Sequence, residues 1–192
     1  MATAQDVADR AREILNDPAK VRWSDAAFCK WLSDALDLLA RFSPGLFTKR
    51  GTHTTTAGAL QIIANARAIS VVRVVGLTEF DKLALDAYSP AWQAATSGAA
   101  AQWAAGDNPK SFYVYPPSAA GVTLTIDFVE APAELTALGD ALPVSDDFVG
   151  PLADYVIGMS EAKDAAHVNA GRSQVFMQAF ASKLGLTTPS KV

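Results

Sequence analysis

The sequence has few of the residues from which disulfides, metal sites and redox centres are built. It contains one cysteine, Cys29, and two histidines, His53 and His167, among 192 residues. A single cysteine excludes an intrachain disulfide and a zinc site made from cysteines. A reactive thiolate needs a basic partner, and Cys29 lies between Phe28 and Lys30 in a helical pattern. We therefore expect Cys29 to be a small core or boundary residue.

Long runs of one residue type are also missing. No stretch of about 18 apolar residues occurs, so no membrane-spanning helix is expected. The charged N-terminus MATAQDVADRAREI does not have the pattern of a signal peptide. The net charge is −4 and no block of lysine and arginine occurs, which argues against a general nucleic-acid-binding face. We expect a protein that is made in the cytoplasm.

Catalytic signatures are absent as well. The sequence has no G-x-S-x-G elbow, no P-loop and no G-x-G-x-x-G. Asp164 lies three residues before His167, which is a possible ligand spacing on a helix. Such a pair is common by chance, and a plain surface pair is the stronger interpretation. The residues alone therefore predict no enzyme, no metal and no cofactor.

Four amphipathic helices are predicted, two near each end of the chain. They cover residues 3–16, 24–42, from within 145–151 to about 164, and 169–184. Thr3 and Ser24 are suitable N-caps, and Gly185 is a suitable C-cap. Apolar residues follow helical spacing in each, most clearly in the second helix: Phe28, Trp31, Leu32, Ala35, Leu36, Leu39.

The middle of the chain has the composition of β-strands. Strands are predicted at 60–63, 70–75, 112–115 and 122–128, and the last of these alternates apolar and polar residues. Residues 52–56 are predicted to form an edge strand or an extended arm. The run at 70–75 is nearly all apolar and is predicted to be covered on both faces. Pro116-Pro117 is predicted to stop the strand before it.

The segment between these strands is rich in aromatic residues. Residues 83–92 predict a short helical turn that Pro90 interrupts, with Tyr88 and Trp92 as an aromatic anchor. Stacking of the aromatics on single-stranded nucleic acid would need interleaved basic residues, and only Lys110 is near. We expect these rings to pack on the sheet instead.

The element order predicts an α+β fold. A bundle of about four helices comes from both chain ends and carries an inserted small antiparallel β-sheet lobe. We expect residues 1–48 and 144–185 to form the helical bundle, 49–143 the β-rich insertion, and 186–192 an extended C-terminal tail.

Two stretches of the middle region, 86–92 (DAYSPAW) and 109–117 (PKSFYVYPP), carry a resemblance to a known family. It continues at 11–17 (AREILND), 21–25 (VRWSD), 152–156 (LADYV) and 163–165 (KDA). The chain resembles the head-to-tail adaptor (connector) proteins of short-tailed phages, of the tail-tubular-protein-A type, from about residue 8 to residue 185.

The resemblance implies a structural protein of the virion, made in the host cytoplasm. Such adaptors form a ring of twelve subunits between the portal and the tail nozzle, and DNA is ejected through the channel without sequence-specific binding. The helical bundle would form the ring wall, and the β insertion would face the nozzle or the tail fibres. By their position in the chain, the C-terminal residues are expected to contact the portal: Leu184, Gly185, Leu186, Thr187, Thr188, Pro189, Ser190, Lys191, Val192.

Two other functional classes stay open at this point. One is a metal-dependent hydrolase that uses Asp164 and His167, and the other is a nucleic-acid-binding module. A connector of long-tailed phages is a smaller helical unit, and the predicted β insertion argues against it.

Overall fold

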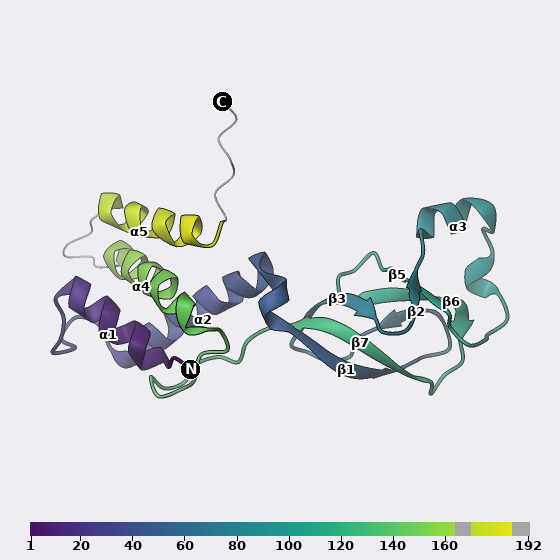
Figure 1. Ribbon diagram of the computed structural model, residues 1–192, viewed down its shortest axis with the longest axis horizontal. Helices are drawn as coiled ribbons and strands as arrows, with labels where there is room; N and C mark the ends of the chain where they lie inside the picture. The colour runs from purple at the N-terminus through teal and green to yellow at the C-terminus, as the bar shows by residue number, and fades with distance from the viewer. Residues whose placement is uncertain (164–169, 186–192) are drawn as a thin grey trace, which may run out of the picture. The chain divides into compact units, whose positions relative to one another are not determined.

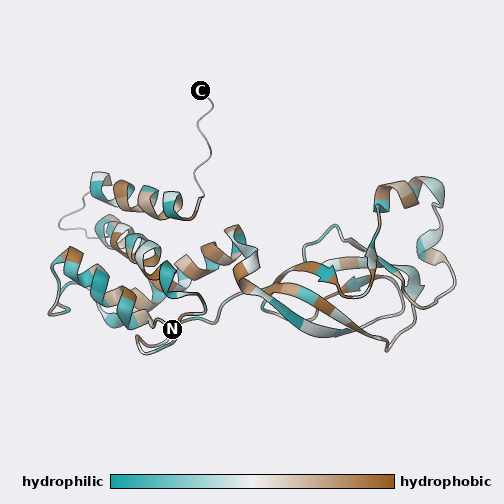
Figure 2. Ribbon diagram, viewed as in Figure 1, coloured by the Kyte–Doolittle hydropathy of each residue, from teal (hydrophilic) through white to brown (hydrophobic). Residues whose placement is uncertain are grey.

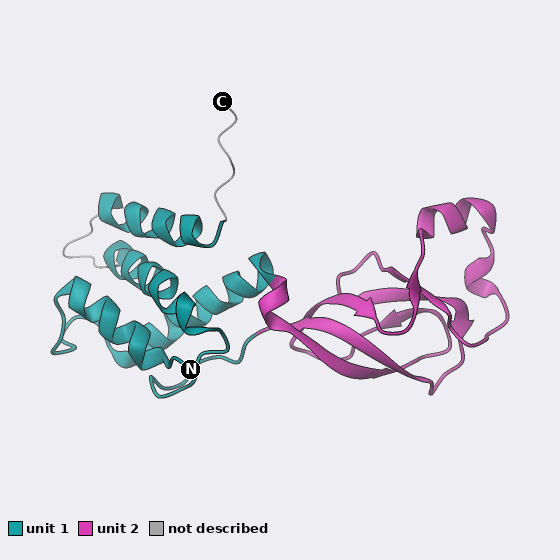
Figure 3. Ribbon diagram, viewed as in Figure 1, with its two compact units in different colours: residues 1–43, 132–192 teal, residues 44–131 magenta. Residues whose placement is uncertain are grey.

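The computed structural model describes residues 1–163 and 170–185. The chain forms two compact units, one from residues 1–43 and 132–192 and the other from residues 44–131 (Figure 3). We call them the helical unit and the β unit. The helical unit contains four α-helices in its described residues, and the β unit contains two small sheets, one α-helix and two short 3-10 helices. The predicted α+β fold class, with four helices and inserted sheet structure, is confirmed.

The helical unit is arranged around α4 (Val149–Lys163), which contacts α1 (Ala4–Leu15), α2 (Asp25–Phe42) and α5 (Ala170–Lys183) (Figure 1). Buried residues lie on all sides of α4, from Leu152 through Ser160. A helix enclosed on all sides needs small or apolar residues around its whole circumference, whereas the amphipathic α1 and α2 bury one face each. Every residue of the α2 stripe named above is buried, as predicted.

The helix ends follow the predicted signals. The backbone N–H of Thr3 donates to the Asp6 carboxylate (2.7 Å), and Ser24 Oγ accepts from the N–H of Ala27 (3.2 Å). Gly185 follows α5 with φ 68°, in the left-handed region that a C-capping glycine adopts without strain. Local sequence therefore sets where α1 and α2 begin and where α5 ends.

Two sheets, not the single predicted sheet, make up the β unit. One has the order β1 (Thr48–Thr54), β7 (Thr123–Glu130), β3 (Ala68–Val74). The other has the order β2 (Gly58–Ile62), β6 (Ser111–Ser118), β5 (Gln102–Ala105), β4 (Thr78–Glu79). All pairs are antiparallel except β4 with β5. Apolar residues of both sheets share one core, and Figure 2 shows hydrophobic segments along these strands: Ile63, Ala68, Val74, Trp103, Phe112, Val114, Ile126, Phe128.

Two strand predictions were wrong. The strand at 112–115 does not stop at the prolines, because β6 runs to Ser118. Proline lacks only the N–H donor, and the Pro117 carbonyl still accepts a hydrogen bond from the N–H of Gly98 (2.8 Å). The strand at 70–75 is not covered on both faces. It is the edge strand β3, irregular in register with β7, and Val72 in it is 44% exposed.

A second, smaller cluster lies on the side of the β2–β6–β5–β4 sheet that faces away from this core. Trp92 is buried there with Ala59 and Tyr113, and the partly buried Phe80, Leu85 and Tyr115 pack against them. Trp92 opens the short 3-10 helix η2 (Trp92–Ala94), which follows α3 (Lys82–Tyr88). The prediction that Trp92 fixes this segment to the sheet is confirmed. Tyr88 is not part of the anchor, because 90% of its surface is exposed.

Candidate functional site

The described residues hold no cluster suited to metal chemistry. Among residues 1–163 and 170–185, no group of three or more His, Cys, Asp and Glu side chains is placed to hold a metal ion. His53 is buried, with Nε2 3.3 Å from Gln61 Oε1 and its ring edge-on to Phe112. Asp164 and His167 lie outside the described residues. None of the described helices is long and apolar enough to cross a membrane.

Cys29 has the environment of a core residue. Its side chain is buried in α2, and burial raises the pKa of the thiol above its ordinary value. The negative charges of Asp140 and Asp25 raise that pKa further. The thiolate needed for nucleophilic chemistry is therefore disfavoured, as expected for a small core residue.

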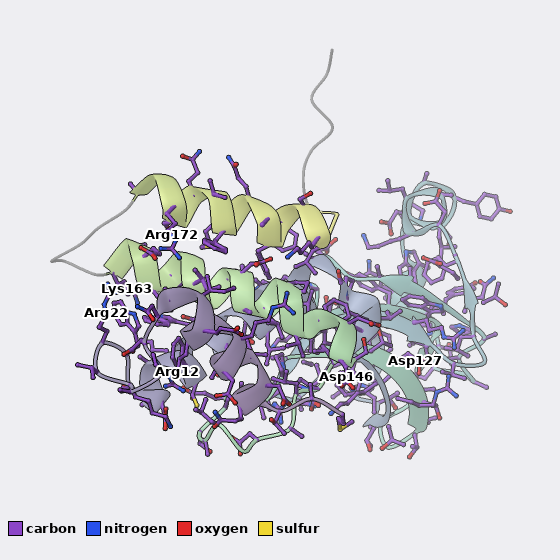
Figure 4. The ribbon with its side chains drawn as sticks, turned by 60° about the vertical axis from the view of Figure 1, so that its left-hand side comes forward. Arg12, Arg22, Asp127, Asp146, Lys163 and Arg172 are labelled. Carbon is purple, nitrogen blue, oxygen red and sulfur yellow. The ribbon has the colours of Figure 1, made fainter. Side chains whose placement is uncertain are left out.

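A buried arginine joins α1 to the start of α2. Arg12, which is labelled in Figure 4, is only 3% exposed. Its Nη2 lies 2.6 Å from Asp25 Oδ1. The guanidinium lies over the Phe28 ring, 4.5 Å from its centroid. Within the described part of the chain, Arg12 Nε and Nη1 have no hydrogen-bond partner. Packing, the ion pair with Asp25 and a long hydrogen bond from Nη2 to the Trp23 carbonyl (3.5 Å) thus hold the side chain in place.

The turn between these helices is built on Asp17. Its carboxylate accepts hydrogen bonds from the backbone N–H groups of Val21, Arg22 and Trp23. Burial alone would raise the pKa of Asp17, but these hydrogen bonds outweigh it and lower the pKa. The stretches 11–17 and 21–25, which carried part of the family resemblance, therefore build the structural turn between α1 and α2.

Charges cluster on the face of the β1–β7–β3 sheet that points away from the core. Asp127 Oδ1 lies 2.8 Å from Arg50 Nε, and Asp127 Oδ2 lies 2.7 Å from Arg73 Nε. The three residues are neighbours in register across β1, β7 and β3. Hydrogen bonds from Arg50 and then Arg73 lower the pKa of Asp127 to about 2. The carboxylate crosslinks the three strands and stays charged in mild acid.

We expect Asp127 to contribute to acid unfolding. Its folded pKa is about 2 against an ordinary value of 3.8, so its stabilising effect is present above about pH 4 and is lost as the pH falls towards 2. Asp127→Asn should therefore flatten the loss of stability between pH 4 and pH 2. Urea unfolding at a series of pH values measures this. A variant whose pH dependence is as steep as that of the wild type would contradict it.

The outward face of α5 is uncharged. Its packing onto α4 uses the ring pair Phe180–Tyr155 (5.1 Å between centroids) and the ion pairs Lys183–Asp154 and Arg172–Glu161. Helical spacing groups Val175 with Phe176, Ala179 and Phe180 and so predicts that Val175 is buried, but it is 62% exposed. It lies on an exposed stripe at three- and four-residue spacing: Gly171, Gln174, Val175, Gln178, Ser182. This exposed, uncharged stripe has the composition of an interface core, because interface cores are depleted of charged residues.

Helix α3 has its polarity reversed relative to an ordinary surface helix. Lys82 pairs with Asp86 and lies over the Tyr113 ring, while Asp86 also accepts a hydrogen bond from Trp92 Nε1 (2.6 Å). The charged side chains are thus engaged at the base of the helix. The residues exposed to solvent are apolar, and two of them are large: Leu83, Ala84, Ala87, Tyr88.

One family model covers almost the entire chain. The model of the SU10 adaptor protein family matches residues 2–191. The chain belongs to the SU10 adaptor protein family. No curated protein matches the sequence. The membership identifies a phage head-to-tail adaptor with a structural role in the virion, and it confirms the broader part of the resemblance seen in the sequence.

The adaptor's expected portal-contact segment is described only at its start. Leu184 is half-buried and Gly185 is exposed, while Leu186, Thr187, Thr188, Pro189, Ser190, Lys191 and Val192 lie outside the described residues. The exposed face of α3 was missed by sequence reasoning. The pattern K-L-A-L-D-A-Y has apolar residues on every side, so nothing in it tells which ones face the sheet.

Proposed function

We propose that the adaptor is of the tail-tubular-protein-A type and forms a twelve-subunit ring between the portal and the tail nozzle. The observation that carries this proposal is the family match over residues 2–191. In this role DNA passes through the ring during ejection without being bound by sequence. A net charge of −4 supports a passive conduit, because like charge keeps a duplex from adhering to the wall.

Exposed uncharged faces on two different elements support assembly into a ring. A cyclic ring of identical subunits needs heterologous contacts, in which one face of a subunit meets a different face of the next. The outward faces of α5 and α3 belong to different units and offer such surfaces. We propose that residues 1–48 and 144–185 form the ring wall and that residues 49–143 contact the nozzle or the tail fibres.

Electron microscopy of native particles tests the proposal directly. We expect density for twelve copies of this chain between the portal and the nozzle, with the helical and β units both recognisable. A position elsewhere in the virion, or a copy number that does not form a closed ring, would overturn it.

We further propose that residues 184–192 contact the portal. Deleting residues 186–192 should leave the fold intact, because the deletion keeps α5 and its C-capping Gly185. The same deletion should weaken docking to the portal. Co-sedimentation with purified portal rings measures docking, and the melting temperature serves as the control for folding. Equal recovery of the truncated and full-length chains on the portal would refute this prediction.

A further inference from the structure

The apolar outward face of α3 has a counterpart in a groove on the same unit. The groove encloses about 180 Å³ beside the edge strand β2. Register pairs Leu60 with Tyr113 and Ile62 with Ser111, so these four side chains lie on one face of the sheet. Leu60 is 43% exposed and Ile62 is 60% exposed. This apolar surface on an edge strand is therefore open to solvent.

The groove is apolar along one side and polar at the other. Leu60, Ile62 and the ring of Tyr113 make the apolar side, and the β5–β6 turn adds Asp107 and Asn108. Asp107 Oδ2 accepts a hydrogen bond from the Tyr113 hydroxyl (3.2 Å). A carboxylate has about four acceptor positions, so Asp107 can accept another donor from a group in the groove.

We propose that Tyr88 of a second copy of this chain fills the groove. A tyrosine side chain has the same division, with an apolar ring and a hydroxyl donor at its end. A cavity of about 150 Å³ holds a benzene ring, so the size of the groove is suitable for one aromatic side chain. Tyr88 is 90% exposed and therefore available to another molecule. Its ring would cover Leu60 and Ile62, and its hydroxyl would donate to Asp107.

The contact is heterologous and deepens the proposed ring, on which it rests. The projecting residue and the groove are different surfaces of one subunit, so each subunit can offer Tyr88 to one neighbour and its groove to the other. Leu83, which is 77% exposed, lies at the other edge of the same exposed face, and the exposed Ala84 and Ala87 lie between it and Tyr88. The charged residues of α3 are engaged with one another and with Trp92, so docking of the exposed face leaves them paired.

Cysteine crosslinking in assembled particles tests the proposal. In a Cys29→Ala background, the full chain carries both Tyr88→Cys and Ile62→Cys, and mild oxidation is followed by non-reducing electrophoresis. We expect a ladder of crosslinked species extending beyond the dimer, because each subunit is joined to two neighbours. Either substitution alone should give no ladder. Both sites are exposed, so folding should be retained, and Leu60→Cys can replace Ile62→Cys as a second pairing.

A matched control replaces Ile62→Cys by Val72→Cys, an exposed apolar position on the other sheet, and should give no ladder. A ladder absent from both pairings in particles that show the ring would overturn the Tyr88 contact and leave the ring standing. Dimers alone from the double variant would mean a two-fold contact and would also overturn it. Particles with neither ring nor ladder would overturn the contact and the proposed function together.

Discussion

Trp92→Ala is expected to lower the free energy of unfolding by about 3–5 kcal/mol, the range for truncation of a large buried aromatic side chain. Trp92 is 2% exposed and packs edge-on against Phe80, Tyr113 and Tyr115. Its indole N–H also donates to Asp86. Alanine would leave a cavity under η2 and would remove the ring that joins the 81–101 segment to β2 and β6.

Urea unfolding followed by circular dichroism measures this effect. Tyr88→Ala provides the matched control, because Tyr88 lies four residues earlier in the same segment and is 90% exposed. The control should change stability by no more than about 0.5 kcal/mol, as is usual for surface substitutions. Equal unfolding midpoints for Trp92→Ala and the wild type would show that the Trp92 cluster does not stabilise the fold.

Arg12→Ala is expected to lower the free energy of unfolding by about 3 kcal/mol, similar to truncation of a long buried apolar side chain. The Arg12 side chain is 4% exposed and covers the Phe28 ring. Its stem and guanidinium both contribute packing, so alanine would leave a cavity between α1 and the start of α2. Loss of the ion pair with Asp25 adds to the effect.

Arg12→Met separates the packing from the charge. Arg12→Met removes one partner of the ion pair, but Asp25 is 48% exposed and keeps its ion pair with Lys20 (3.1 Å), so no unpaired charge is left buried. Two of the Arg12 nitrogens have no partner in the described structure, so few hydrogen bonds are lost with the guanidinium. Methionine should therefore retain stability to within about 1 kcal/mol in the same urea experiment. If methionine is as damaging as alanine, the ion pair with Asp25 is the main contribution and the packing argument is wrong.

The helices could be predicted because their signals are local. In α2, a run of core residues at helical spacing follows an N-capping serine, and all of these act within a few residues along the chain. The exposure of Val175 in α5 was mispredicted because helical spacing alone does not show what holds a helix to its neighbour. Much of α5 is fixed by ion pairs and by close approach to Gly158, so its apolar residues do not all define the buried face.

The surfaces could not be predicted because they depend on distant partners. Arg50 and Arg73 meet Asp127 across separations of 77 and 54 residues, and no short pattern links them. Tyr88 and Trp92 are aromatic neighbours in one segment, yet one is exposed and the other is buried. Only the position of η2 over Ala59 and Tyr113 distinguishes them, and that position is set by the sheet.

The central place of α4 in the helical unit has a consequence for the order in which the protein matures during synthesis. The apolar residues of α1 pack mainly against α4, which begins more than a hundred residues later in the chain. By contrast, the β unit is one continuous segment and is complete once residue 131 has left the ribosome. The lobe encoded in the middle of the chain can therefore fold first. Helix α1 must keep the face that packs on α4 uncovered until residues 149–163 have been translated.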